Sequence, residues 1–447
     1  MAQQRKTNPE MMSGEDSAGL TRRDFFKFLA GTAVTLAALD KATAAVYQSI
    51  ATLNQKYIND ESPDGLYWDG IRGQFLFEDG LVMMNNGTVG PMPKPVFNTL
   101  IRTFKLQATN PYDVYNFLPT FQDRTRAKLA EFINASPEEV VLTHNTTEGI
   151  NFVTVGLDMK EGDEVVVSNM EHPGAINPWK LKEKRYGIVI KEVPFGLPPK
   201  SVDEIVGSVA AAVTPRTKII SLGHTVFITG LITPLKELSR MAHEKGLLVL
   251  ADSAHGLGML DLNMKELGID FFASSPYKWM GAPTGIGLFY VRKEAQDRLW
   301  PTIVTGGWDR YTDARRFECH GQDADALVLA LDEALNFQNA IGKVRIERRI
   351  KSLAGYLKQE LRKVPGIKIH TPDDPYLSAG LTAFSLDGVD PTRIVDYVRE
   401  KYNIVVRTIG SKDAGTYAVR VSTPIYVTRN DIDHFVEGVR ALASHRA

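Results

Sequence analysis

Several common features are scarce in this 447-residue sequence. It contains one cysteine, Cys319, which excludes an internal disulfide framework and a cysteine-based zinc site. The nine histidines show no HExxH or comparable ligand spacing. The formal net charge is −1, and no strongly basic block follows the first 30 residues, so nucleic-acid binding has no electrostatic support. The one apolar stretch near the N-terminus is shorter than the roughly 20 residues of a stable membrane span.

What is present is an ordinary globular composition. Hydrophobic residues make up 43% of the chain and charged residues 23%, and the length is sufficient for two domains with sizeable cores. No repeats or low-complexity tracts follow the N-terminal region.

The N-terminal region has the layout of a secretory signal. In "TRRDFFKFLAGTAVTLAALDKATA", Arg22 and Arg23 precede a short apolar run, and Ala42-Thr43-Ala44 offers a small-residue cleavage site. The stretch "TRRDFFK" resembles a twin-arginine signal. The alternative, an amphipathic surface helix, has poor periodic support. We expect residues 1–45 to be a signal, the export machinery to be a partner, and a mature periplasmic or secreted chain to start near Ala45.

The middle of the chain alternates short β-branched runs with helical patterns. Such alternation predicts an α/β domain with a mainly parallel seven-stranded sheet sandwiched by helices. The runs are "VVLTH", "EVVVSN", "IVIKEV", "TKIISL", "LLVLAD", "DFFASS" and "GIGLFYV". Two long helices and short strands near 366–370, 380–386 and 418–422 then predict a smaller C-terminal α+β domain. We expect a large domain over 81–315, a small domain over 316–447, and a segment over 46–80 that packs with the small domain.

Lys278 raises a chemical question. It lies among aromatic and small residues in "FFASSPYKWMGAPTGIGLFYV", where an ammonium loses hydration. Desolvation lowers the pKa of a lysine toward the nucleophilic amine, whereas a snorkelling surface lysine would stay charged. The stretch alone leaves both readings open.

Other polar residues follow the neighbouring strands. Ligands of open α/β sheets bind at the carboxyl ends of the strands. There the sequence places Thr146 and Thr147 at a helix start, suited to a phosphate or to ordinary capping, and His172 after the next run. Asp252 ends a further run, where a buried carboxylate could pair with a cation.

Together these residues describe a site for pyridoxal phosphate. The lysine would form a Schiff base with the cofactor aldehyde, a carboxylate would keep the pyridine nitrogen protonated, and helix amides and hydroxyls would hold the phosphate. A flat side chain would stack on the ring.

At this point the chain resembles the class V aminotransferases among the fold-type I pyridoxal-phosphate enzymes. The ordered motifs cover nearly all of the expected mature chain and are specific only in combination. They are "LVMMNNGTVGPMP", "THNTTEGIN", "MEHPGAINPW", "ADSAHGLG", "SSPYKWMGAPTGIG", "FECHGQD" and "VRVSTPIYVTRNDIDHFVEGV".

The resemblance implies a role for each matching residue. Lys278 matches the Schiff-base lysine, Asp252 the partner of the pyridine nitrogen, and His172 the stacking residue. The remaining cofactor ligands implied are His255 at the phenolic oxygen and Thr146, Thr147, Ser275 and Tyr277 at the phosphate. Arg420 matches the arginine that binds the substrate α-carboxylate through bidentate hydrogen bonds.

A homodimer is also implied. The "GQD" at 321–323 falls where family members offer a Gly-Thr pair to the neighbour's phosphate, and Gln322 departs from that threonine.

The reaction stays open between epimerisation, transamination and β-elimination, with an amino acid or peptide-derived substrate. The stretches "NNGTVGPMP" and "FECHGQD" look more like the isopenicillin N epimerase-like branch. A cysteine desulfurase needs a nucleophilic cysteine in the loop before Arg420, and residues 407–420 contain none. The residues beside Cys319 give no reason for a lowered thiol pKa, so we favour a structural or interface role for this cysteine. A binding protein that lost its chemistry is the non-enzyme alternative.

Two residues have alternative interpretations. Asn86 would approach the substrate from the N-terminal segment, or belong to a tight Asn-Gly turn, which we favour. Arg407 would bind a second acid group of the substrate, or be a charge at a strand edge.

Overall fold

A seven-stranded mixed sheet forms the centre of the molecule in the computed structural model, which describes residues 33–57, 65–199, 201–322, 324–412 and 415–444. Its order is β2-β8-β7-β6-β5-β3-β4, and only β8 runs antiparallel to its neighbours. The strands are β2 (Val140–Thr143), β3 (Glu164–Ser168), β4 (Val189–Val193), β5 (Thr217–Gly223), β6 (Leu248–Asp252), β7 (Phe271–Ser274) and β8 (Gly287–Val291). The predicted mainly parallel seven-stranded sheet is therefore confirmed.

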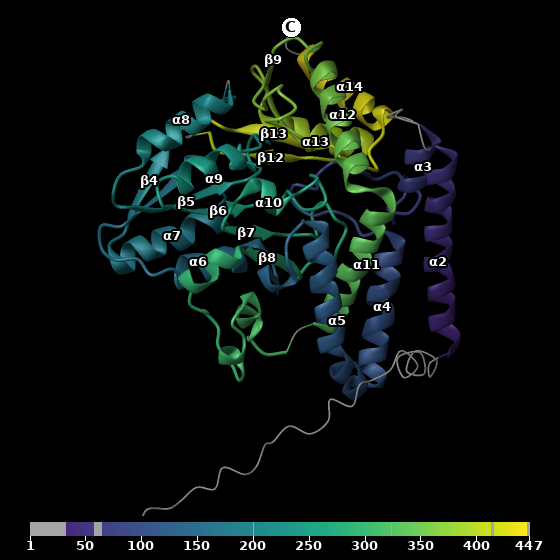
Figure 1. Cartoon of the computed structure of the whole chain (residues 1–447). Coiled ribbons are helices and arrows are strands. Elements are labelled where there is room, and N and C mark those ends of the chain that lie inside the picture. The colour runs from purple at the N-terminus through teal and green to yellow at the C-terminus, as the bar shows by residue number, and fades with distance from the viewer. Residues whose placement is uncertain (1–32, 58–64, 200, 323, 413–414, 445–447) are drawn as a thin grey trace, which may run out of the picture.

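Most of these strands are rich in apolar residues because helices cover both faces of the sheet, whereas the edge strand β4 contains Lys191 and Glu192 and is largely unburied. Successive residues of one strand enter two different cores: Val165 and Val167 pack with Trp179, whereas Val166 packs with Leu238. Helices α6 and α7 cover one face and α8 and α9 the other (Figure 1). The helices of this region are α6 (Thr146–Gly156), α7 (Pro173–Tyr186), α8 (Val202–Ala212), α9 (Leu235–His243) and α10 (Met264–Leu267), with 3-10 helices η1 (Pro137–Glu139), η2 (Lys293–Arg298), η3 (Trp308–Arg310) and η4 (Ala314–Glu318).

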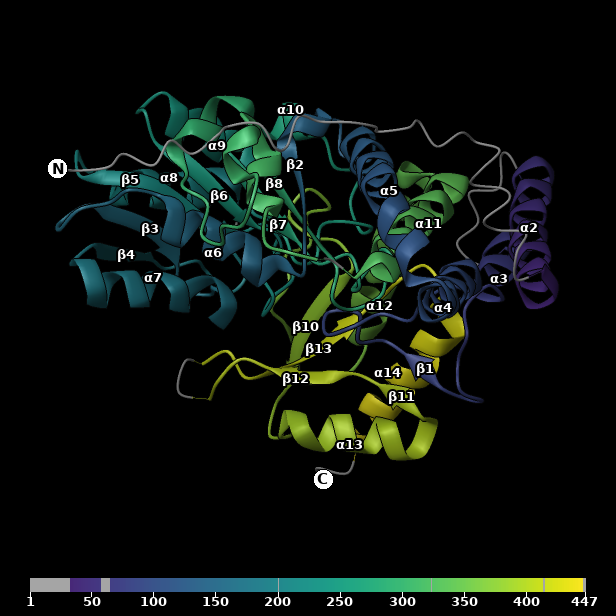
Figure 2. The same cartoon turned by 90° about the horizontal axis from the view of Figure 1, so that it is seen from below.

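A smaller antiparallel sheet of order β12-β13-β10-β9 lies in the C-terminal part (Figure 2). Its strands are β9 (Ile367–Ile369), β10 (Leu381–Leu386), β12 (Arg407–Ile409) and β13 (Ala418–Ser422), and the accompanying helices are α11 (Asp325–Ile341), α12 (Lys343–Leu361), α13 (Pro391–Tyr402) and α14 (Arg429–Ser444). A separate two-stranded parallel sheet joins β1 (Val82–Met83) to β11 (Ile404–Val405). Through β1, the segment before the large sheet contacts the C-terminal part.

The N-terminal helices pack against C-terminal ones. Tyr47 donates a hydrogen bond to Glu333, and Arg72 forms an ion pair with Asp431 at 2.6 Å. These helices are α2 (Ala33–Lys56) and α3 (Leu66–Arg72), followed by α4 (Lys94–Thr109) and α5 (Pro111–Phe132). Helix α2 thus contacts α11, and α3 contacts α14.

The predicted signal falls largely outside the described residues, including Arg22 and Arg23. Helix α2 continues across the predicted cleavage point at Ala44 and Ala45. Among the described residues, none of the helices combines the length and apolar character needed to cross a membrane.

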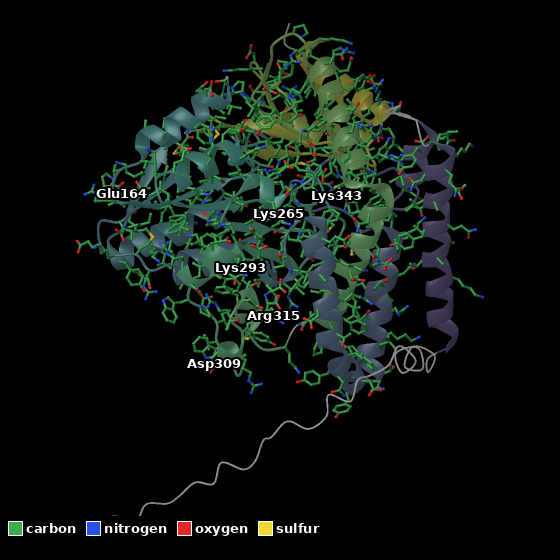
Figure 3. All side chains as sticks on the ribbon, viewed as in Figure 1. Glu164, Lys265, Lys293, Asp309, Arg315 and Lys343 are labelled. Atoms are coloured by element: carbon green, nitrogen blue, oxygen red, sulfur yellow. The ribbon has the colours of Figure 1, made fainter. Side chains whose placement is uncertain are left out.

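The charged side chains labelled in Figure 3 come from separate parts of the chain, and some of them form ion pairs. Arg315 in η4 pairs with Asp313 at 2.6 Å, and Lys343 in α12 pairs with Asp261 at 2.9 Å. The net charge of −1 thus results from nearly equal numbers of positive and negative side chains.

Candidate active site

The carboxyl ends of the strands bring the predicted residues to one rim. Asp252 is the last residue of β6, and Ser275 directly follows β7. Thr146 begins α6 after β2, and His172 is the N-cap of α7 after β3. A pocket of about 270 Å³ is lined by His172, Asp252, His255 and Lys278.

The proposed phosphate end is built from hydroxyl groups at a helix N-terminus. The backbone N–H of Thr146 donates to Ser275 Oγ at 3.1 Å, and the two hydroxyl oxygens lie 2.7 Å apart. Asn145 caps α6 by accepting from the Glu148 N–H. The helix therefore has an ordinary cap, and the buried hydroxyls of Thr146 and Ser275 also lie together at its N-terminus, so the two sequence interpretations are compatible.

Two further predicted phosphate ligands lie at the edge of this group. Thr147 is exposed, and its Oγ1 would lie 2.8 Å from a β-carbon added at Gly174. This places the hydroxyl beside the first turn of α7. Tyr277 is half-buried and accepts the Gly90 N–H through its carbonyl at 3.0 Å.

Burial sets the chemistry of Lys278. Desolvation lowers the pKa of its amine to about 8, Asp252 opposes this, and the guanidinium groups of Arg420 and Arg407 lower the pKa further. A larger fraction of the amine is then unprotonated near neutral pH than for a lysine in water. This favours the nucleophilic interpretation of Lys278 over the snorkelling one.

Asp252 is the carboxylate whose negative charge raises the pKa of the Lys278 amine. Burial raises its pKa, while the Ala254 N–H at 3.1 Å and the charge of Lys278 favour the ionised form. A protonated ring nitrogen beside it would stabilise the ionised carboxylate, as a buried charge requires a partner.

His172 presents a neutral ring to the pocket. Its Nδ1 accepts the Gly174 N–H at 3.0 Å, and desolvation lowers the pKa of the imidazole. Phe227 contacts the ring edge-on, with centroids 4.9 Å apart at 83°. These two contacts fix the orientation that a stacking residue needs.

His255 has a defined tautomer. The indole N–H of Trp279 lies 3.3 Å from His255 Nδ1, and an indole nitrogen only donates. Burial lowers the pKa of His255 well below its usual range, so the ring is neutral and its proton is on Nε2. Nε2 is then a hydrogen-bond donor, as the predicted role at the phenolic oxygen requires.

Arg420 enters from the small sheet. It lies on β13, is 2% exposed, and donates from Nη1 to the Phe227 carbonyl at 2.8 Å. Its Nε is buried without a partner among the described residues, and burial lowers the pKa of the guanidinium to about 9. A carboxylate would satisfy this buried charge.

Asn86 lies in a turn, as favoured from the sequence, and joins two parts of the site. The Thr88 N–H donates to the Asn85 carbonyl at 2.9 Å. The Asn86 amide donates to the Lys278 carbonyl at 2.8 Å and accepts from the Tyr426 hydroxyl. At 3% exposed, the side chain contacts protein on both sides, so its observed role is to hold the Lys278 loop.

Gln322 and Cys319 lie apart from these residues. Gln322 is exposed in the segment after η4, and its predicted contact concerns a neighbouring subunit. Cys319 is half-buried at the end of η4, and desolvation raises the pKa of its thiol, which disfavours the nucleophilic thiolate.

Sequence reasoning missed three residues of the site. Glu171 lines the same pocket, and burial raises its pKa to about 7, with the Ser168 hydrogen bond opposing and Asp252 adding to the rise. Its position directly before His172 at a strand end was the available signal. Phe227 and Trp279 act through contacts between distant segments, for which a single sequence has no signal.

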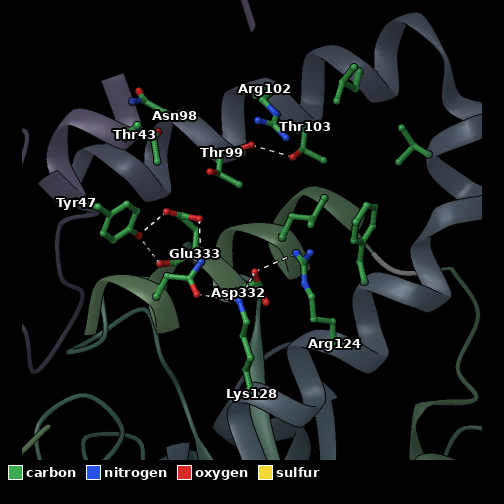
Figure 4. A pocket seen from close by; sticks show the side chains of 16 residues that line it. Thr43, Tyr47, Asn98, Thr99, Arg102, Thr103, Arg124, Lys128, Asp332 and Glu333 are labelled. Carbon is green, nitrogen blue, oxygen red and sulfur yellow. Dashed lines mark hydrogen bonds and ion pairs between the residues drawn. The ribbon is translucent and has the colours of Figure 1, made fainter. Parts of the chain in front are cut away.

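A larger cavity of about 1200 Å³ lies elsewhere, between α2, α4, α5 and α11 (Figure 4). Its charges are already paired: Arg124 and Lys128 both contact Asp332 at 3.0 Å, and Tyr47 contacts Glu333. The smaller pocket is therefore the candidate active site, because it holds an amine of lowered pKa and a carboxylate, and because its residue Phe227 accepts a hydrogen bond from the buried guanidinium of Arg420.

The architecture is shared with solved structures. One of a C-DES mutant with glycine covalently linked to its PLP cofactor matches with a TM-score of 0.76 at 24% identity, over 83% of this chain and 98% of that one. This likeness shows the fold, the fold-type I class.

The sequence comparisons give the family. Residues 91–435 match Aminotransferase class-V, and the chain belongs to this family. Isopenicillin N epimerase of Streptomyces clavuligerus is 30% identical over 394 residues, 84% of this chain and 98% of the relative. A probable cysteine desulfurase of Methanothermobacter thermautotrophicus is 30% identical over 342 residues, 73% of this chain and 83% of the relative. The protein is a pyridoxal 5′-phosphate-dependent enzyme.

The residues present fit this cofactor. Two buried hydroxyls at a helix N-terminus suit a phosphate, an amine of lowered pKa suits an aldehyde, and a buried carboxylate suits a protonated ring nitrogen. These groups line or adjoin one pocket.

Proposed function

We propose that this protein is an exported enzyme that acts at the α-carbon of an amino acid or peptide-derived substrate, with an isopenicillin N epimerase-like reaction. The observation that carries the proposal is that Lys278 shares its pocket with Phe227, whose carbonyl accepts a hydrogen bond from the buried guanidinium of Arg420. Proton removal at an α-carbon requires two groups around it. One is an amine that accepts the proton, and the other is a cation that binds the carboxylate. The 30% identity to the epimerase of Streptomyces clavuligerus supports the choice of reaction.

Each residue that holds the cofactor would have a separate role. When bound, pyridoxal 5′-phosphate supplies an aldehyde carbon for the substrate amine and a ring that delocalises charge from the α-carbon. Thr146 and Ser275 would hold the phosphate, and Asp252 would keep the ring nitrogen protonated. His172 would stack on the ring, and His255 would donate a hydrogen bond from Nε2.

Lys278 would carry out the proton transfer at the α-carbon. Arg420 binds the substrate carboxylate and thereby fixes the α-carbon relative to the Lys278 amine. With a pKa of about 8, that amine is a base suited to accept the α-proton near neutral pH. The same residues would serve transamination or elimination, which differ in where the next proton goes or in which bond breaks.

Persulfide chemistry has the weakest support. The loop between β12 and β13, residues 410–417, contains no cysteine, although desulfurases are among the relatives. Cys319 is not among the residues that line the pocket, and the pKa of its thiol is raised.

Deuterium incorporation tests the proposed reaction. Purified holoenzyme is incubated in deuterated water with candidate amino acids and short peptides, and products are analysed by chiral chromatography and mass spectrometry. We expect deuterium at the α-carbon together with inversion of configuration. A keto acid in the absence of inversion would assign transamination, and release of pyruvate or ammonia would assign elimination; either result overturns the epimerase proposal.

Export is proposed from the N-terminal sequence alone. We expect the protein in the periplasmic or secreted fraction, with a mature N-terminus near Ala45. Replacing Arg22 and Arg23 together by lysine should retain the protein in the cytoplasm, whereas Arg5→Lys should not. Secreted material that still begins at Met1 contradicts the proposed cleavage.

A homodimer is also proposed. Helix α4 exposes Phe97, Ile101 and Phe104 at helical spacing, with exposed fractions of 38%, 44% and 48%. An exposed apolar stripe of this kind is typical of an association surface. The family resemblance, which assigns residues 321–323 to the neighbour's phosphate, makes a second copy of this chain the expected occupant.

A further inference from the structure

Two arginines lie directly opposite each other on the small sheet. Arg407 of β12 and Arg420 of β13 are partners in the antiparallel register. Side chains at such positions share one face of the sheet, with β-carbons about 4.5–5.5 Å apart, and like charges there are destabilising. A negative charge beside the two guanidinium groups would therefore stabilise this arrangement.

The described residues do not supply that charge. Arg420 donates to the Phe227 carbonyl, and Arg407 donates to the Thr88 hydroxyl at 3.2 Å. Neither arginine forms an ion pair within the part of the chain that the structure describes. Both guanidinium groups also lower the pKa of Lys278, so both charges act on the candidate active site.

The two arginines lie at different depths. Arg420 is 2% exposed, whereas Arg407 is an exposed residue at the outer side of the same face. Thr88, in the turn formed by residues 85–88, contacts the outer arginine, and Gly87 of the same turn lies against the inner one. One carboxylate satisfies one guanidinium in bidentate geometry, which leaves the other cation available.

We propose that the substrate carries a second acidic group, and that Arg407 binds this group while Arg420 binds the α-carboxylate. This inference rests on the proposed function and names a substrate class for it. Arg407 is then a specificity-determining residue.

The alternative is a charge that protects a sheet edge. Strand β12 is the edge strand of the small sheet, and edge strands often carry charged residues that prevent pairing with other chains. An edge charge would not discriminate between substrates, so ligand preference separates the two interpretations.

A matched pair of amino acids tests the proposal. L-norleucine and L-2-aminoadipate have side chains of similar length, and only the second ends in a carboxylate. Each is titrated into the holoenzyme, and its dissociation constant is measured from the change in the visible absorbance of the cofactor. The proteins compared are wild type, Arg407→Ala, Arg407→Lys, and the control Arg393→Ala, which removes an exposed arginine of α13.

We expect wild type and Arg393→Ala to bind L-2-aminoadipate about tenfold or more tightly than L-norleucine, as for a charge-assisted hydrogen bond. The ratio should fall to near one in Arg407→Ala and recover in part in Arg407→Lys. Equal affinities in wild type, or a preference that persists in Arg407→Ala, overturn the inference. A purified protein that shows no visible cofactor band would instead contradict the proposed function.

Discussion

At the scale of the residue, the activity of Lys278 depends on desolvation. Desolvation of the buried amine lowers its pKa to about 8, while Asp252 opposes this change and the two arginines add to it. The attacking species in cofactor uptake is the neutral amine, whose fraction rises with pH through that value.

A pH profile tests this electrostatic account. In cofactor-free protein, the rate of pyridoxal 5′-phosphate uptake should rise with pH and level off above a midpoint near 8. Asp252→Asn removes the charge that favours the ammonium form, so its midpoint should lie at lower pH. Asp297→Asn, which alters a carboxylate 96% exposed, should keep the wild-type midpoint. A midpoint near the value of about 10.4 for lysine in water contradicts the account.

Trp279 is a positioning residue for His255. Trp279→Phe keeps an aromatic ring but removes the N–H that fixes the imidazole tautomer. We expect the visible absorbance band of the loaded enzyme to shift and its pH dependence to change, effects that loss of packing alone would not produce.

The matched control is Trp300→Phe, which removes a different indole hydrogen bond, to Asp158 at 3.0 Å. Its absorbance band should match wild type. If Trp279→Phe also retains the wild-type band, the role assigned to the indole is wrong.

At the scale of the element, the turn at residues 85–88 joins the two sheets. Its Gly87 N–H donates to Ser422 Oγ of β13 at 3.0 Å, and Asn86 donates to the carbonyl of Lys278. A β-carbon at Gly87 would lie 2.4 Å from Nη2 of Arg420. This turn therefore fixes Arg420, the residue proposed to bind the substrate carboxylate, relative to Lys278.

Gly87→Ala tests this element. The added methyl group must displace the guanidinium, so we expect L-norleucine to bind about tenfold more weakly, while the visible cofactor band is retained. Gly207→Ala, where the added carbon meets nothing within 4 Å, should bind as wild type does. Unchanged affinity in Gly87→Ala would show that Arg420 does not depend on the turn.

At the scale of the whole molecule, the proposed dimer depends on the apolar stripe of α4. Ile101→Asp places a charge in its centre and should convert a dimer to monomers in size-exclusion chromatography with light scattering. Leu181→Asp on α7, at a residue 55% exposed, is the control and should stay dimeric. A monomeric wild-type protein contradicts the proposal.

Features of the fold that follow from the pattern of one segment could be predicted from the sequence, whereas features that depend on the pairing of distant segments could not. Most strands of the large sheet were predictable because burial on both faces favours short apolar runs, and the edge strand β4 was predictable from its β-branched residues. The pairing of β1 with β11 was not predicted, since two-residue strands have no periodic signal. The opposition of Arg407 and Arg420 depends on strand register, which a single sequence does not give.

The candidate site was predictable to a similar extent. Residues at strand ends, such as Asp252, follow from the rule for parallel sheets, whereas the contact of Trp279 with His255 is a product of tertiary packing. Asn86 shows the intermediate case, because the turn was predictable and its contact with Lys278 was not.

The central claim is that Lys278 binds the cofactor covalently. The most direct measurement is borohydride reduction of the purified holoenzyme, followed by proteolysis and mass spectrometry of the peptides. The account predicts that the reduced cofactor is attached to the peptide that contains Lys278, and that Lys278→Ala carries none while the exposed-lysine variant Lys265→Ala carries it as wild type does. Attachment to a different lysine, or no attachment in a yellow wild-type protein, would contradict it.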